Sequence, residues 1–272
     1  MIKVLEFPKK EFETKEELFK CLKDNKKKLI SLKKSETKNA DAVSYGSLEV
    51  VSKKDLTNKA EGNGQTNAES LMVTVVINTT NFLDSHGDVH IKGIWNKSVK
   101  DNSTFLHLQE HDRSFDKIIS DDAKGYTKTI TWKELGQPFS GSTEALIFES
   151  DILKIRNEFM LNQYANGWVK NHSVGMRYVG MELAINSEAE WNKEEKEIWD
   201  EYYPTIANKE LADEKGYFWA VTEAKIIEGS AVVMGSNSAT PTLSNKEIEP
   251  LEDTQEDEPT EVTQNKRRKL LI

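Results

Sequence analysis

Cysteine is almost absent from this sequence, since Cys21 is the only one among 272 residues. An internal disulfide is therefore excluded, and this composition suits a reducing compartment such as the cytoplasm. Long apolar runs are missing as well, because no stretch approaches the roughly 20 apolar residues that cross a bilayer. Residues 1–6 also lack the continuous apolar segment of a secretory signal. We therefore expect neither a membrane span nor secretion, and no catalytic role for Cys21.

The sequence also has no surplus of positive charge. The chain has 46 acidic and 37 basic residues, which gives a formal net charge of −9. This balance argues against general nucleic-acid binding. The hydrophobic fraction of 37% and the charged fraction of 31% are too polar for a fully compact globule, so we expect solvated extensions around a core. The apolar residues concentrate between about 71 and 243, where the core should lie.

The first 69 residues form a Lys-rich segment that we separate from the core. A helix is predicted over residues 14–34, because Thr14 and Glu17 match a capping box and apolar residues recur along one stripe. This helix either docks an acidic partner or packs on the core, and the sequence leaves both open. The polar residues 52–70 then indicate a linker or a long loop.

The last segment, residues 245–272, has a different composition. Acidic residues dominate it as far as Glu261, together with Pro250 and Pro259, so it cannot bury enough apolar surface to order itself. We expect a disordered, charged tail. It closes on the basic and apolar residues 266–272, which either recruit a partner or are simply the end of the tail.

The middle segment, residues 70–244, has the pattern of a folded domain. Helices are predicted over 151–168 and, from a second capping box at Ser187 and Glu190, over 188–203. Many strands with few helices indicate an α+β fold, with a mainly antiparallel β-sheet or β-barrel core and flanking helices. The predicted strands are residues 71–77, 104–108, 126–132, 144–148, 172–181, 217–227 and 230–233.

Residues 105–112 carry two histidines and admit two chemical interpretations. His107, Glu110 and His111 match the H-x-x-E-H pattern of a zinc hydrolase, which needs a helix to bring both histidines to one face. The preceding residues alternate like a strand, however, and in a strand positions 107 and 111 lie about 13 Å apart. The second interpretation makes His111 a general base at the end of a strand. A metal-dependent hydrolase remains the alternative, while our prediction includes no metal and no cofactor.

A general base needs a nucleophile, and Ser173 is the candidate. It precedes Val174 and Gly175 at the start of an apolar strand. A serine hydroxyl becomes a good nucleophile only when a neighbouring base takes its proton. Gly175 would let backbone amides approach a developing oxyanion closely. Without a base nearby, Ser173 would be an ordinary serine in a strand.

Four blocks of the sequence follow one another in an informative order. They are the D-x-x-G-D-x-x-x-x-G loop of residues 84–93, the His-Asp end of residues 106–112, the Ser-x-Gly strand of residues 173–176 and the E-x-S-x-V strand of residues 228–232. In this order the blocks resemble the caudovirus prohead protease family, whose fold is related to the herpesvirus maturation protease. The resemblance covers roughly residues 70–243. The loop after the last block departs from the family, which usually has Pro-Ala-Asn where this chain has residues 235–237.

The resemblance implies a herpesvirus-protease-like serine endopeptidase with Ser173 as nucleophile and His111 as base. The family's third residue falls on Glu228, whereas the herpesvirus relative uses a second histidine. His172 would point to the opposite face of its strand, which favours a structural role. Arg177 lies two residues past Gly175, and the related herpesvirus enzyme employs an arginine in oxyanion stabilisation, which implies that role here; a surface arginine is the other interpretation.

The implied role is bacteriophage capsid maturation. The enzyme would work in the host cytoplasm inside the immature capsid, or prohead. Its substrates would be the scaffold, the N-terminal segment of the major capsid protein and the chain itself. Self-association as a dimer is a further expectation, since the herpesvirus relative works as a dimer. We expect no nucleic-acid or membrane partner. A non-enzymatic, scaffold-like protein of the capsid interior is a further alternative that the sequence leaves open.

Overall fold

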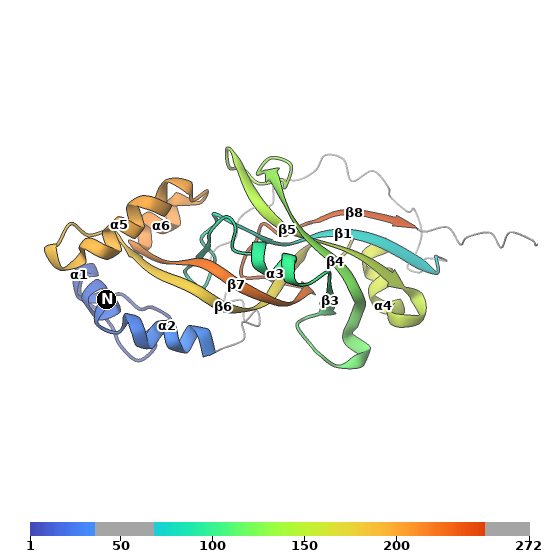
Figure 1. The fold of residues 1–272 in the computed structure, drawn as a ribbon, viewed down its shortest axis with the longest axis horizontal. Helices are drawn as coiled ribbons and strands as arrows, with labels where there is room; N and C mark the ends of the chain where they lie inside the picture. Colours follow the sequence, from blue (N-terminus) through green and yellow to red (C-terminus); the bar gives the residue numbers. More distant parts are fainter. Residues whose placement is uncertain (36–67, 248–272) are drawn as a thin grey trace, which may run out of the picture.

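The computed structural model describes residues 1–35 and 68–247, and a single eight-stranded sheet runs through it (Figure 1). The order of its strands is β2-β7-β3-β4-β5-β1-β8, and β6 pairs with β7 off this path. The strands are β1 (Ser70–Thr79), β2 (Asp88–His90), β3 (Thr104–Gln109), β4 (Ile118–Thr131), β5 (Ser142–Leu153), β6 (Asn171–Ile185), β7 (Tyr217–Val232) and β8 (Thr242–Glu247).

The predicted α+β class is confirmed, and the sheet is flanked by helices as expected. Most strand pairs are antiparallel, but β2 and β3 both run parallel to β7, so the sheet is mixed. No pairing among the described strands closes it into a barrel, which corrects that part of the expectation. Parallel pairing joins strands that lie far apart in sequence, and local alternation of apolar residues does not reveal it.

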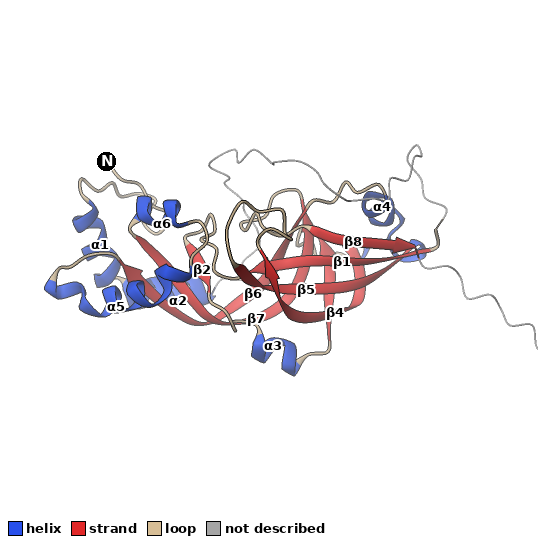
Figure 2. Ribbon diagram, turned by 90° about the horizontal axis from the view of Figure 1, so that it is seen from above, coloured by secondary structure: helices blue, strands red, loops and turns tan. Residues whose placement is uncertain are grey.

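The helices other than α3 gather at the two ends of an elongated molecule, and α3 lies near its middle (Figure 1). Figures 1 and 2 show α1, α2, α5 and α6 around the part of β6 and β7 that extends beyond the rest of the sheet, while α4 lies near the opposite end. No helix in the described ranges is long and apolar enough to cross a membrane. The helices are α1 (Lys15–Asp24), α2 (Lys26–Ser35), α3 (Asn96–Asp101), α4 (Lys154–Ala165), α5 (Lys193–Tyr202) and α6 (Lys209–Lys215).

The predicted helix 14–34 consists of two helices that meet at Asn25. Thr14 caps α1 as expected, because its hydroxyl accepts the N–H of Glu17 at 3.2 Å. The buried face of α1 belongs to the same apolar core as the strands. Lys33 of α2 also pairs with the buried Asp88 of β2 at 2.8 Å. Of the two interpretations of this segment, the structure shows the packed one.

Several predicted boundaries are wrong. The capping box at Ser187 does not start a helix, since α5 begins at Lys193 after a short 3-10 turn. The two strands predicted over 217–233 are one strand, β7, and β8 continues past residue 244 to Glu247. Helix α4 is shorter than its predicted range, and α3, α6 and β2 were not foreseen. The expected linker up to residue 67 and the expected tail from residue 248 lie outside the described residues.

Candidate active site

The candidate site forms along β7, which lies between β3 and β6. In the parallel pair, Leu108 of β3 is the register partner of Ser230. In the antiparallel pair on the other edge, Ser173 of β6 is also the partner of Ser230, and Gly175 is the partner of Glu228. Side chains two residues apart in a strand share a face, so Glu228 and Ser230 face the same side as Ser173. The register therefore brings the predicted nucleophile beside the predicted acid.

A tight turn after β3 places His111 in the site. Glu110 and His111 both have positive φ, 52° and 57°, which is uncommon for residues with a side chain. Three hydrogen bonds to β7 and the residue after it hold the turn. The Glu110 N–H donates to the carbonyl of Ala231 at 2.8 Å, its carboxylate accepts the N–H of Val233 at 2.8 Å, and the His111 N–H donates to the Ser230 hydroxyl at 3.1 Å.

His111 and Glu228 form a buried, hydrogen-bonded pair. His111 Nδ1 lies 2.5 Å from Glu228 Oε1, and the two side chains are only 5% and 1% exposed. An ionised carboxylate only accepts hydrogen bonds, so a neutral imidazole paired with it carries its proton on Nδ1 and keeps the lone pair of Nε2. Nε2 is buried and has no hydrogen-bond partner among the described residues. The arrangement leaves a fixed imidazole with its basic nitrogen available.

Ser173 completes the group, and this residue is buried, with 7% of its surface exposed. Directly opposed residues of an antiparallel pair have Cβ atoms about 4.5–5.5 Å apart, which places Ser173 next to Ser230 and hence next to the His111–Glu228 pair. The Ser173 hydroxyl is not hydrogen-bonded to His111 Nε2 in this structure. Contacts between a nucleophile and its base are often long until substrate is bound. The three predicted residues therefore belong to one site.

Gly175 has a clear steric reason to be glycine. A Cβ at this position would lie 1.8 Å from Glu228 Oε1, so any other residue would displace the carboxylate. The sequence suggested an amide donor to an oxyanion here, and that role stays a prediction. Arg177 is exposed, and within the described part of the chain it has no hydrogen bond or ion pair, so its proposed oxyanion role also remains a prediction.

The structure does not bring the zinc-motif residues together. His107 lies in a strand instead of a helix, and its ring contacts Ser150 and Tyr164. Glu110 holds the turn through the N–H of Val233, and His111 pairs with Glu228. Nowhere in residues 1–35 and 68–247 do three His, Cys, Asp or Glu side chains gather as metal ligands would.

A second group of buried histidines lies on the other side of the strands. His172 Nδ1 lies 2.9 Å from the carbonyl of Thr240, so Nδ1 donates and Nε2 accepts. The Tyr164 hydroxyl, 2.9 Å away, donates to that Nε2 and accepts from His107 Nε2 at 3.1 Å. His107 Nδ1 then accepts the hydroxyl proton of Ser150 at 3.0 Å. Each polar atom has one consistent role, which supports the structural assignment of His172.

Burial keeps this chain of groups neutral. Loss of hydration lowers the pKa of His172 to about 4, although the carbonyl of Thr240 opposes the shift. Burial, and secondarily the nearby His172, lowers the pKa of His107 well below its usual value. Burial also raises the pKa of Tyr164 well above its usual value. These groups hold the strands in place and do not exchange protons near neutral pH.

The two buried histidines predict loss of stability in acid. The pKa of His172 falls from 6.5 in the unfolded chain to about 4 in the folded protein, so the unfolded state binds more protons between these values. The stabilisation is complete above about pH 6.5 and decreases as the pH falls towards 4, by about 3 kcal/mol for this group. Urea unfolding from pH 7 to 4.5 checks this, and His172→Gln should flatten the profile. A stability that does not change over this range would contradict it.

Two features of the site were missed from sequence. Ser230 had no assigned role, although its spacing of two from Glu228 puts both on one face of a strand. Tyr164 was considered only as part of a helix.

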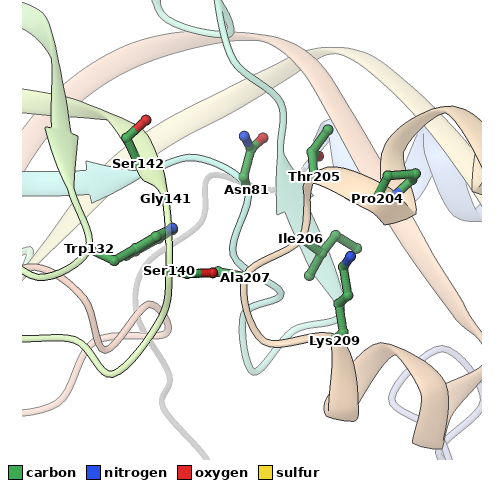
Figure 3. A pocket seen from close by; sticks show the side chains of 10 residues that line it. All are labelled: Asn81, Trp132, Ser140, Gly141, Ser142, Pro204, Thr205, Ile206, Ala207 and Lys209. Carbon is green, nitrogen blue, oxygen red and sulfur yellow. The ribbon is translucent and has the colours of Figure 1, made fainter.

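A pocket of about 390 Å³ lies between the β4–β5 turn and residues 204–209, with Asn81, Trp132 and Lys209 among its lining (Figure 3). No predicted catalytic residue lines this pocket.

The candidate site is assigned only from the sequence and the structure of this chain. Comparisons with protein-family models, with curated proteins and with solved structures find no match for it.

Proposed function

We propose that this protein is a serine endopeptidase of the tailed-phage prohead maturation type. The observation that supports the proposal most strongly is the buried contact of 2.5 Å between His111 Nδ1 and Glu228 Oε1, with Ser173 on the neighbouring strand. A buried histidine with one nitrogen fixed by a carboxylate and the other without a partner is the arrangement that general-base catalysis requires.

The proposed reaction follows from the roles of these atoms. Ser173 Oγ attacks the carbonyl carbon of the peptide bond as His111 Nε2 takes its proton. The same Nε2 then donates that proton to the leaving amine, which gives an acyl-enzyme. Water, deprotonated by Nε2, hydrolyses this ester and restores Ser173. Glu228 holds the imidazole in the productive tautomer and stabilises the imidazolium, while Gly175 and Arg177 are the proposed oxyanion donors.

The proposed substrates are the scaffold, the N-terminal segment of the major capsid protein and the enzyme's own charged ends. The ordered resemblance of residues 84–93, 106–112, 173–176 and 228–232 to prohead proteases supports this choice. Exposed, unstructured segments are where proteolysis concentrates. The proposed place of action is the interior of the immature capsid, where self-association of the enzyme would occur.

Neither alternative has an observation in its favour. A metal-dependent hydrolase would need His107 and His111 to bind the same metal ion. In the structure, His107 contacts Tyr164 and His111 contacts Glu228. A non-enzymatic capsid protein would gain nothing from the buried Nε2 of His111, which costs stability because it has no hydrogen-bond partner among the described residues.

The proposal is tested by incubating the purified full-length chain alone and following its mass with time. We expect the wild-type chain to shorten, a serine-directed phosphonate to stop the shortening, and EDTA to leave it unchanged. Loss of activity with EDTA that zinc restores would instead favour the metal-dependent hydrolase. No shortening together with no phosphonate adduct would favour the non-enzymatic protein.

A further inference from the structure

The Ser230 hydroxyl lies at the centre of the candidate site. Ser230 is fully buried in β7, two residues after Glu228 and on the same face. Its register partners are Leu108 of β3 and Ser173 of β6. It is therefore the residue of β7 that lies between the strand leading to the histidine and the strand carrying the nucleophile.

Ser230 contacts both members of the histidine–carboxylate pair. Its hydroxyl donates to Glu228 Oε2 at 2.6 Å and accepts the backbone N–H of His111 at 3.1 Å. Glu228 Oε1 in turn lies 2.5 Å from His111 Nδ1. These three hydrogen bonds form a closed cycle. The Ser230 hydroxyl binds both the backbone N–H of His111 and the carboxylate that contacts the His111 imidazole.

Each member of the pair has few other restraints close to the reacting atoms, so the hydroxyl adds a needed one. Glu228 has three rotatable side-chain bonds, and the cross-strand residue beside it is Gly175, which has no side chain to restrict the carboxylate. His111 has a left-handed backbone, with φ of 57°, which persists only where surrounding contacts impose it. Catalytic groups need support of this kind to keep their geometry.

We propose that Ser230 is a positioning residue that holds Glu228 and the backbone of His111 in register, so that His111 Nε2 faces Ser173. This inference rests on the proposed function. Ser230 contacts neither substrate nor the attacking oxygen in this role, and it acts through the Glu228 carboxylate and the His111 backbone N–H. A serine hydroxyl suits the position because it donates and accepts at once, whereas alanine does neither.

The first test measures peptide cleavage by Ser230 variants. Ser230→Ala should lower kcat roughly 10- to 100-fold with little change in KM, as expected when an orienting group is lost. Ser230→Thr, which keeps the hydroxyl, should recover most of the rate. Ser230→Cys, which is close in size and a weak donor, should fall between the two and serves if the alanine variant does not fold.

The matched control is Ser98→Ala. Ser98 is also a buried serine whose hydroxyl accepts a backbone N–H of β7, that of Ile226 at 2.9 Å, but it does not contact the pair. The Ser98→Ala protein should be less stable than the wild type but should keep its kcat. In a Glu228→Ala background, Ser230→Ala should cause a much smaller further loss, because of its two contacts only the one to the His111 backbone N–H is left. Full additivity of the two losses would overturn the inference.

A second test does not depend on catalysis. In Ser173→Ala protein, the proton between His111 Nδ1 and Glu228 should give a low-field NMR resonance. Ser230→Ala should move or broaden it, and Ser98→Ala should leave it unchanged. An unchanged resonance in the Ser230→Ala protein would overturn the positioning role. If the resonance responds but wild-type protein cleaves nothing, the proposed function fails and the positioning of the pair by Ser230 stands.

Discussion

Replacing Ser173 by alanine should abolish cleavage, with a loss of about 10⁴- to 10⁶-fold in kcat. The remaining groups bind and polarise a peptide, but no oxygen is placed to form the acyl-enzyme next to His111. Co-expression with the major capsid protein and the scaffold gives the readout. Mass spectrometry should find both substrates uncut in assembled particles that contain the Ser173→Ala chain, and cut in those that contain the wild type.

Ser238→Ala is the control for this experiment. Ser238 is exposed in the loop after β7 and makes no contact with the His111–Glu228 pair, so its removal should leave the products unchanged. Cleavage at the wild-type rate by the Ser173→Ala chain would show that another residue is the nucleophile. Failure of assembly in both alanine variants would instead point to a structural fault, which the melting temperatures of the purified chains would reveal.

The second large effect is expected at the His111–Glu228 pair. His111→Ala should lose about as much activity as Ser173→Ala, and the double variant should be no worse, because the two residues act as a unit. Glu228→Gln should lose less, about 10²- to 10⁴-fold in kcat. An amide N–H facing Nδ1 would favour the tautomer that carries its proton on Nε2, and that nitrogen could then no longer accept a proton from Ser173.

Glu223→Gln is the matched control for the carboxylate. Glu223 lies on β7 as well, but its side chain is partly exposed and pairs with Lys97 at 3.3 Å. An exposed ion pair of this kind contributes little, so the variant should retain activity. Equal activity of the Glu228→Gln and Glu223→Gln chains would contradict the role of Glu228 as the orienting group.

The candidate residues could be predicted from sequence because they occur in short blocks whose order is informative. The Ser173, His111 and Glu228 assignments each depended on that order. What the blocks could not give was the pairing of strands: β3 and β7 run parallel although more than a hundred residues separate them. Local periodicity contains no information on which distant strand is a neighbour.

Glycines explain part of what was misread. The apolar pattern predicts two strands, 217–227 and 230–233, that leave out Glu228 and Gly229, yet β7 runs through both residues. A Cβ at Gly229 would lie 2.6 Å from the ring of Phe148, so the glycine allows a close packing contact inside the strand. Gly175 similarly makes room for the carboxylate of Glu228. In both cases the cause is a side chain from a distant element, which only the structure reveals.

The buried polar groups were the hardest to assign. His107 appeared in a metal motif, but its partners Ser150 and Tyr164 come from β5 and α4. The capping box at Ser187 satisfied the local rule for a helix start, and the chain instead begins α5 after Asn192, whose amide donates to the carbonyls of Ile185 and Ser187. At each position, hydrogen bonds that a helix pattern does not contain outweighed that pattern: tertiary ones at His107 and ones within the loop before α5 at Asn192.

The most direct test of the account is to map the adduct of a serine-directed phosphonate on the purified full-length chain. Peptide mass spectrometry should locate the adduct on Ser173 of the wild-type protein, and the His111→Ala chain should react far more slowly because its serine lacks the base. An adduct on another serine, or equal labelling of the His111→Ala chain, would contradict the assignment of Ser173 and His111 as the catalytic pair.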